Sequence, residues 1–210
     1  MSAALAIKHT PEQYYRLERA APHKSEFLHG DIIAMAGGTS RHSLIKSNLI
    51  RELGNKLKGR PCAPYDSDQR LRVKDTGLRT YPDAAVYCGK MEYDSEDSQA
   101  ETATNPTAIF EVLSDSTEAY DRGAKAAHYR RIESLKAYVL ISQNMPFVEI
   151  IQLVPGQGWQ MSDAAGLDAS LRIPCLDIEL SLAEIYDRVT WDGPGQSIIP
   201  LRVVEEAPLR

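Results

Sequence analysis

Apolar residues recur along this chain at spacings that predict alternating helices and strands. Between residues 45 and 57 an apolar side chain stands at every fourth position, which is typical of an amphipathic helix. Residues 26–36 contain two apolar runs around His29-Gly30, and this pattern predicts a β-hairpin. A helix is also expected over residues 10–21, where a threonine cap precedes a proline.

The rest of the chain predicts further strands and two more helices. The expected strands are residues 69–74, 83–88, 107–113, 136–142 and 147–153. One helix is expected from about residue 118 to 133, and a short last helix begins at the capping-box sequence SLAE, residues 181–184. The residues between 89 and 106 are expected to form an acidic loop. Helices before, between and after mostly sequential strands indicate an α/β fold with a mixed β-sheet flanked by helices.

The composition is that of an ordinary soluble globular protein. Of the 210 residues, 43% are hydrophobic and 25% are charged. We expect one domain over residues 1–189 and a C-terminal extension over residues 190–210, where a stretch rich in Pro and Gly begins. No apolar run approaches the roughly 20 residues of a membrane helix, and the N-terminus lacks the features of a secretion signal. A cytoplasmic protein without a membrane partner is therefore expected. The three scattered cysteines argue against both a disulfide framework and a thiolate zinc site.

Charge is distributed unevenly along the chain. The net charge of −5 argues against a non-specific nucleic-acid coat protein. Basic residues nevertheless gather between residues 41 and 60 and again between 122 and 136. Such residues could contact phosphates, or they could simply be solvated helix faces. The candidate DNA contacts are Arg41, Lys46, Arg51, Lys56 and Arg122.

Two carboxylates occupy positions where a strand would ordinarily be apolar. Glu111 interrupts the sequence IFEVL, where an unpaired carboxylate would cost several kcal/mol of desolvation. Asp83 stands at the edge of the strand DAAVYC. On adjacent strands the two acids could share a hard divalent ion, with the carbonyl of Val112 as a further ligand. Alternatively, Asp83 is a turn former and Glu111 forms a structural ion pair with Lys125 or an arginine.

Lys125 completes this candidate set. It lies four residues after Asp121 on a predicted helix, so both side chains can face the same end of the sheet. The chain contains no HExxH, GxxxxGK[ST] or GxSxG motif, which argues against a zinc enzyme, an ATPase and a serine hydrolase.

Three long segments of the chain resemble one protein family. They are YPDAAVYC, PTAIFEVLSDSTEAYDRGAKAAHYRRIESLKAYVLIS and IPCLDIELSLAEIY. Together they resemble the Uma-type family of restriction-endonuclease-like proteins in the PD-(D/E)XK nuclease superfamily, over about residues 10–189. The resemblance implies a restriction-endonuclease-like fold and Mg²⁺-dependent hydrolysis of phosphodiester bonds in DNA, duplex or branched, with Mn²⁺ as a substitute. A homodimer is expected, because one site per chain cuts one strand.

The family's functional positions can be carried over residue by residue. Asp83 matches the PD carboxylate and Glu111 the second acid. The superfamily lysine would stand at Leu113, so in this chain its role is assigned to Lys125 on the following helix. The family match also makes Glu26 and His42 accessory candidates, to which Asp121 is added. The alternative function is a catalytically silent nuclease-fold module for binding or assembly. A less favoured alternative is a nuclease domain whose target recognition comes from a partner.

Overall fold

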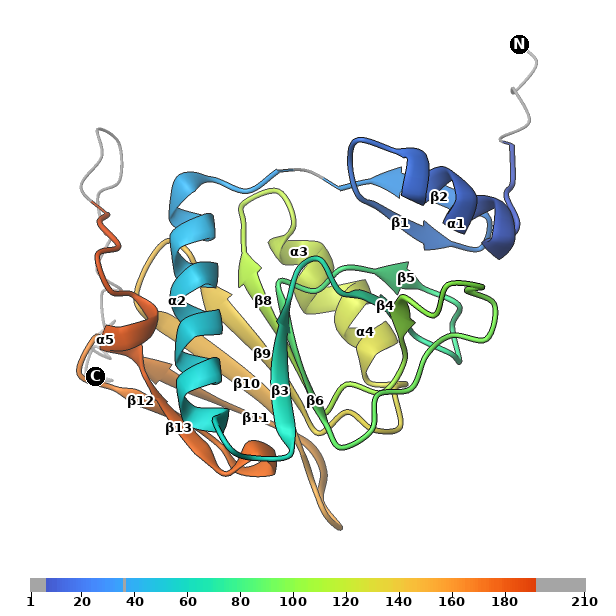
Figure 1. Cartoon of the computed structure of the whole chain (residues 1–210). Coiled ribbons are helices and arrows are strands. Elements are labelled where there is room, and N and C mark those ends of the chain that lie inside the picture. Colours follow the sequence, from blue (N-terminus) through green and yellow to red (C-terminus); the bar gives the residue numbers. More distant parts are fainter. Residues whose placement is uncertain (1–6, 36, 192–210) are drawn as a thin grey trace, which may run out of the picture.

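The computed structural model describes residues 7–35 and 37–191, which fold around a mixed β-sheet with helices on both faces (Figure 1). This main sheet has the strand order β11-β10-β9-β8-β6-β3. Its strands are β3 (Cys62–Asp66), β6 (Ala84–Cys88), β8 (Ala108–Leu113), β9 (Ala137–Ser142), β10 (Phe147–Val154) and β11 (Gly158–Ala165). Strands β8 and β9 are parallel and the other neighbours are antiparallel, so the sheet is mixed, as the sequence predicts.

One long helix and several short helical segments accompany the sheets. They are α1 (Pro11–Ala20), α2 (Ser40–Leu57), α3 (Glu118–Tyr120), the π-helical turn η1 (Asp121–Lys125), α4 (Ala126–Tyr129), the 3-10 turn η2 (Pro174–Leu176) and α5 (Leu182–Ile185). The first two predicted helices are confirmed, and Thr10 caps α1 as expected. The third is interrupted by the π-helical turn and ends at Tyr129 rather than near residue 133. Within the described residues, no helix has the length and apolar character needed to cross a membrane.

The two faces of the main sheet pack against different helices because alternate residues of a strand point to opposite sides. Phe110 and Val112 of β8 belong to a core that includes the apolar face of α2. Ile109 and Leu113 belong to a second core that includes residues of α4. Glu111 stands between them in this alternation, so its side chain shares the face of the sheet that α4 covers.

A second sheet carries the N-terminal part of the chain, in the order β2-β1-β5-β4-β7. Its strands are β1 (Ser25–Leu28), β2 (Asp31–Ala34), β4 (Arg70–Arg72), β5 (Arg79–Thr80) and β7 (Thr102–Ala103). The predicted hairpin is confirmed as β1–β2, and its turn places both His29 and Gly30 at positive φ. Helix α1 packs Tyr14 and Tyr15 against Phe27 of β1.

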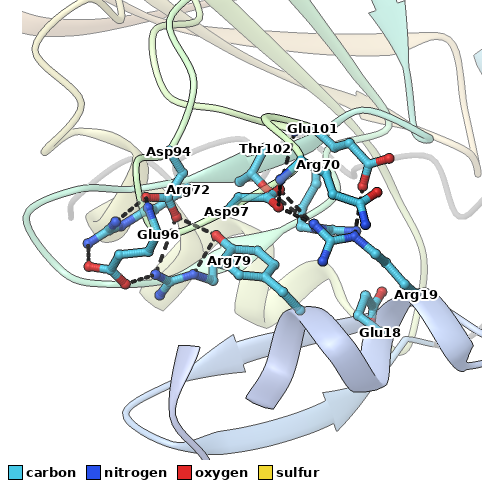
Figure 2. A network of polar contacts seen from close by, with 12 residues as sticks. Glu18, Arg19, Arg70, Arg72, Arg79, Asp94, Glu96, Asp97, Glu101 and Thr102 are labelled. Atoms are coloured by element: carbon cyan, nitrogen blue, oxygen red, sulfur yellow. Dashed lines mark hydrogen bonds and ion pairs between the residues drawn. The ribbon is translucent and has the colours of Figure 1, made fainter. Parts of the chain in front are cut away.

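Buried charged side chains join α1 to β4, β5 and the acidic loop (Figure 2). The Arg79 side chain is only 2% exposed and donates to Glu96 over 2.6 Å and to the Tyr15 hydroxyl over 2.8 Å. The Tyr15 hydroxyl in turn donates to Asp94. The acidic loop is therefore held to the N-terminal sheet by arginines, and it contributes the short strand β7, which the sequence did not predict.

A third, two-stranded sheet consists of β12 (Ser170–Ile173) and β13 (Ile178–Ser181) and packs with α5 against α2. In the described part of the chain, two smaller sheets thus accompany the predicted mixed sheet. The helix predicted at SLAE is confirmed as α5, but the Ser181 side chain makes no capping hydrogen bond. Apart from its first two residues, the expected C-terminal extension lies outside the described residues.

A disulfide joins Cys62 to Cys88, so the expectation of no disulfide is wrong. The two cysteines face each other across the antiparallel pair β3–β6, with their Cα atoms 3.9 Å apart, although 26 positions separate them in the sequence. The pairing could not be predicted because residues 62–66 had not been predicted as a strand. Cys175 is the free cysteine of the described region.

Candidate active site

The two candidate acids lie side by side at the β6–β8 pair, and a backbone N–H group fixes each carboxylate. Asp83 immediately precedes β6, and Glu111 lies in β8, which pairs with β6. The N–H of Asp83 donates to Oε2 of Glu111 over 3.1 Å, and the N–H of Val112 donates to Oδ2 of Asp83 over 2.9 Å. These reciprocal bonds hold the two carboxylates side by side at the same end of the sheet.

Lys125 lies beside Glu111, on the helical segment that follows β8. Its Nζ is 2.9 Å from Oε1 of Glu111, 3.2 Å from Oδ1 of Asp121 and 3.7 Å from Oε1 of Glu26. Asp121 and Lys125 are the two ends of the π-helical turn η1. Such turns are rare and often mark functional sites, because they change which side chains of a helix point inward.

The Lys125 side chain is almost fully buried among carboxylates. Its exposure is 6%, and those of Glu26, Glu111 and Asp121 lie between 4% and 9%. Burial by itself lowers the pKa of the lysine, but Glu111, Asp121 and Glu26 together raise it above its ordinary value. Lys125 is therefore a stable ammonium ion at neutral pH.

Burial, together with the nearby charges of Asp83 and Asp121, raises the pKa of Glu111 to about 7 against the opposing effect of Lys125. The Tyr129 hydroxyl also donates to Oε1 of Glu111 over 2.9 Å. Any additional positive charge close to this carboxylate would stabilise its ionised form and lower its pKa.

His42 and Lys46 approach Asp83 from α2. His42 Nε2 lies 3.1 Å from Oδ2 of Asp83, and Lys46 Nζ lies 3.9 Å from its Oδ1. Burial lowers the pKa of His42, but the hydrogen bond and charge of Asp83 outweigh it, so the pKa is raised. Burial likewise raises the pKa of Asp83, but His42, the Val112 N–H and Lys46 lower it overall. Asp83 is therefore the ionised partner.

Glu26 reaches the same region from β1. Besides its ion pair with Lys125, it accepts hydrogen bonds from Thr80 and, over 2.9 Å, from the Tyr120 hydroxyl. The structure thus brings Glu26, His42, Asp83, Glu111, Asp121 and Lys125 together around one cavity of about 460 Å³. A larger hollow of about 1210 Å³ between α1 and the acidic loop lies apart from these residues and contains none of them.

The donor chemistry of this cavity is suited to Mg²⁺. Four carboxylates and a single ammonium group line it, so negative charge is in excess. In the part of the chain that the structure describes, no three His, Cys, Asp or Glu side chains form a group that could hold a metal by themselves. Mg²⁺ commonly uses only one or two carboxylates and completes its octahedron with water and substrate phosphates. Asp83 and Glu111 match that smaller requirement, with the main-chain carbonyl of Val112 as a further candidate.

The candidate DNA contacts do not share one surface. Residues five positions apart on a helix are rotated by about 140°, which separates Arg41, Lys46, Arg51 and Lys56 around α2. Arg41 donates to the carbonyl of Thr190, Lys46 points toward Asp83 and the exposed Lys56 lies near the far end of the helix. Among these four, Lys46 is the residue next to the candidate acids.

Two of the five candidate contacts, Arg51 and Arg122, are paired with acids. Arg51 lies 2.8 Å from Glu52 and 3.8 Å from Asp187. Arg122 bonds to Glu118 over 2.7 Å and also pairs with Glu149. A phosphate would have to compete with these carboxylates for both guanidinium groups.

Three hydroxyl groups around the acids were missed in the sequence. Tyr129 follows Lys125 by four residues, a spacing that places both on one side of a helix and could have drawn attention to it. Tyr120 precedes Lys125 by five residues and comes close to it through the π-helical turn, which the sequence did not reveal. Thr80 lies in a strand of only two residues, and no sequence pattern marked it.

A solved structure and two curated proteins are similar to this chain. A crystal structure described as "a putative nuclease belonging to DUF820" from Anabaena variabilis ATCC 29413 superposes with a TM-score of 0.65 at 18% identity, covering 82% of this chain and 96% of that one. The chain is also 32% identical over 169 residues to "Uncharacterized protein sll1609" of Synechocystis sp. (strain ATCC 27184 / PCC 6803 / Kazusa), covering 80% of this chain and 94% of that protein. "Uncharacterized protein slr1290" of the same organism is 33% identical over 176 residues, or 84% of this chain and 89% of that protein.

The mixed sheet flanked by helices is the restriction-endonuclease-like fold, a nuclease fold that the sequence had predicted. The family can be stated more closely. A family model, Uma2, described as "Putative restriction endonuclease", matches residues 11–183, and the chain belongs to this family. Family and fold together support a nuclease-like function.

Proposed function

We propose that this protein is a Mg²⁺-dependent endonuclease that hydrolyses phosphodiester bonds in DNA through Asp83, Glu111 and Lys125. One observation carries the proposal. Two carboxylates, one just before β6 and one in β8, are each held by a backbone N–H group and line a cavity with the Lys125 ammonium 2.9 Å from one of them. A structural ion pair would need only one of the two acids, whereas the cavity carries an excess of carboxylates over ammonium groups.

Asp83 and Glu111 would hold the Mg²⁺ ion, with the Val112 carbonyl as a third protein ligand. The bound ion would neutralise phosphate charge and lower the pKa of a water molecule. Asp83 is suited to this role because its lowered pKa keeps it ionised at neutral pH. Glu111 has a raised pKa and would lose its proton as the ion binds.

Lys125 would act as a fixed positive charge rather than as a proton acceptor, because its raised pKa keeps it protonated. A phosphodiester gains negative charge on the way to its pentavalent transition state, and a preorganised ammonium group stabilises that charge. Asp121 and Glu26, both in ion-pair contact with the amine, would hold it in place. His42 would orient Asp83 through its 3.1 Å contact.

The DNA backbone would be contacted by Lys46, the candidate nearest to Asp83, and more weakly by Arg41, Arg51, Lys56 and Arg122. The protein would act in the cytoplasm, and as a homodimer where both strands of a duplex are to be cut, because each chain has one such site.

The test is divalent-ion-dependent cleavage of DNA by the full chain and three variants. Asp83→Asn and Glu111→Gln keep side-chain shape but remove charge, so each should abolish cleavage with Mg²⁺ or Mn²⁺ while the circular dichroism spectrum stays unchanged. Asp163→Asn is the matched control, because Asp163 is exposed on β11 and does not line the cavity. Equal cleavage by wild type and Asp83→Asn would assign the activity to a contaminant and contradict the proposal. A catalytically silent binding module predicts no cleavage by any of the proteins.

A further inference from the structure

One face of the β1–β2 hairpin places three apolar side chains beside Glu26 at the candidate active site. Glu26 and Ile33 are directly paired across the hairpin, so their side chains lie next to each other on one face. Leu28 and Met35, two residues further along each chain segment, share that face. All four line the cavity that contains Asp83 and Glu111.

The opposite face of the hairpin packs into a hydrophobic core cluster. Phe27 is buried against Tyr14 and Tyr15, and Ile32 packs against this cluster. The cavity face is covered only in part: Leu28 packs against the second core, whereas Ile33 is 54% exposed. An apolar surface next to a strongly charged one would suit a ligand that has an apolar part and a charged part.

The acids themselves lie deep in this cavity. The side chains of Asp83 and Glu111 are only 15% and 5% exposed, and the cavity of about 460 Å³ is the size of a small-molecule site. A continuous duplex keeps its bases paired and stacked, so it cannot place a base against the apolar wall of this cavity. A single strand can, because it is flexible and its bases are free to leave the stack.

We propose that the hairpin face formed by Leu28, Ile33 and Met35 receives an unpaired base next to the scissile phosphate, so that the substrate is single-stranded DNA or the unpaired strand of a fork. The phosphate would lie toward Lys125 and the two acids, and the base against the apolar wall. The Tyr120 ring, which also lines the cavity, offers a surface on which a base can stack. This inference rests on the proposed function, because that function places the phosphate at Asp83 and Glu111.

The experiment measures binding separately from cleavage. Fluorescence anisotropy of the full chain is recorded with one labelled single strand and with the blunt duplex of the same sequence, in Ca²⁺ instead of Mg²⁺. The single strand should bind about tenfold more tightly than the duplex. Ile33→Ala should weaken single-strand binding by about fivefold and leave duplex binding unchanged. Met161→Ala is the matched control, because Met161 is an apolar strand residue, 65% exposed, outside the cavity lining.

A second pair of variants isolates stacking. Tyr120→Phe and Tyr120→Leu both lose the hydrogen bond to Glu26, but only Leu removes the aromatic ring. Tyr120→Leu should therefore bind the single strand about fivefold more weakly than Tyr120→Phe. The strand carrying 2-aminopurine should show a fluorescence change on binding that Tyr120→Leu reduces.

Two outcomes overturn the inference: single-strand affinity no greater than duplex affinity, or single-strand affinity unchanged in both Ile33→Ala and Tyr120→Leu. Mg²⁺-dependent cleavage is then compared on the same DNA forms. Cleavage of blunt duplex as fast as of single strand contradicts this inference and leaves the proposed function standing. Tight single-strand binding without cleavage of any form contradicts the proposed function and leaves the binding preference standing.

Discussion

The ammonium group of Lys125 lies 2.9 Å from Oε1 of Glu111, and both side chains are at least nine-tenths buried. The two residues belong to different elements, β8 and the π-helical turn η1. A buried charge that loses its partner costs far more than an exposed one, because its lost hydration is no longer offset. Their proximity therefore gives a direct prediction about stability.

Replacing Lys125 by Met, which keeps the length of the side chain, should lower the free energy of unfolding by about 3 kcal/mol. The cause is the loss of the only ammonium group lining a cavity that holds four carboxylates. Urea unfolding measures the effect, with Lys74→Met as the matched control, since Lys74 forms a Lys–Glu pair that is 58% exposed. A loss below about 1 kcal/mol would mean that the carboxylates are compensated in another way.

Stability should also fall as the pH rises from 4.5 to about 7. The folded-state pKa of Glu111 is raised from 4.5 to about 7, so in that range the folded protein keeps a proton that the unfolded chain has released. A state that binds more protons is favoured at low pH, and the free energy of unfolding must therefore decrease as the pH rises. Glu111→Gln removes this titration and should show a flatter dependence. Parallel curves for the two proteins would contradict the raised pKa.

Lys46 should contribute to DNA binding more than Arg51 does, although both belong to α2. Lys46 approaches Asp83, whereas Arg51 is paired with Glu52 and Asp187. Lys46→Gln should weaken binding and reduce the slope of log affinity against log salt by about 1. The reason is that one phosphate contact is lost and fewer counterions are released on binding. Arg51→Gln should change the slope less. Equal slopes for wild type and Lys46→Gln would show that Lys46 does not touch phosphate.

Arg79 should be critical for holding the acidic loop and α1 to the N-terminal sheet. It is 2% exposed and bonds to Tyr15, Asp94 and Glu96 (Figure 2). Arg79→Met should cost about 3 kcal/mol of the free energy of unfolding, because the Asp94 carboxylate is left buried with one partner fewer. Arg172→Met, at an ion pair 64% exposed, should change stability by less than about 0.5 kcal/mol. Thermal and urea unfolding compare the two variants, and similar effects would contradict the role given to Arg79.

The sequence predicts the elements that carry the candidate site better than it predicts the rest of the fold. Strand β8 can be recognised from its run of apolar residues, in which Glu111 is the exception. The hairpin and α2 can be recognised from the spacing of their apolar residues. Strand β3 was missed because it contains Pro64, and β11 because most of its residues are exposed and no apolar run marks it. Without β3, the pairing of Cys62 with Cys88 had no geometric basis.

Long-range contacts account for what the sequence could not predict in the site. The hydroxyl of Thr80 reaches Glu26 only because β1 and β5 pair side by side, and no spacing in the sequence reflects that pairing. The π-helical turn depends on the hydrogen bonds of the folded helix. The strand pattern and the family resemblance both indicate Asp83, Glu111 and Lys125, and the structure places them together; their roles in catalysis are a prediction.

The central claim is that Asp83 and Glu111 together hold a divalent ion. Its most direct test is anomalous diffraction from crystals of the full chain soaked in Mn²⁺, with crystals of Asp83→Asn treated in the same way. The account predicts an anomalous peak between the two carboxylates, about 2.1 Å from an oxygen of each, in the wild type and none in the variant. A wild-type crystal without a peak at this position, with both carboxylates well ordered, would contradict it.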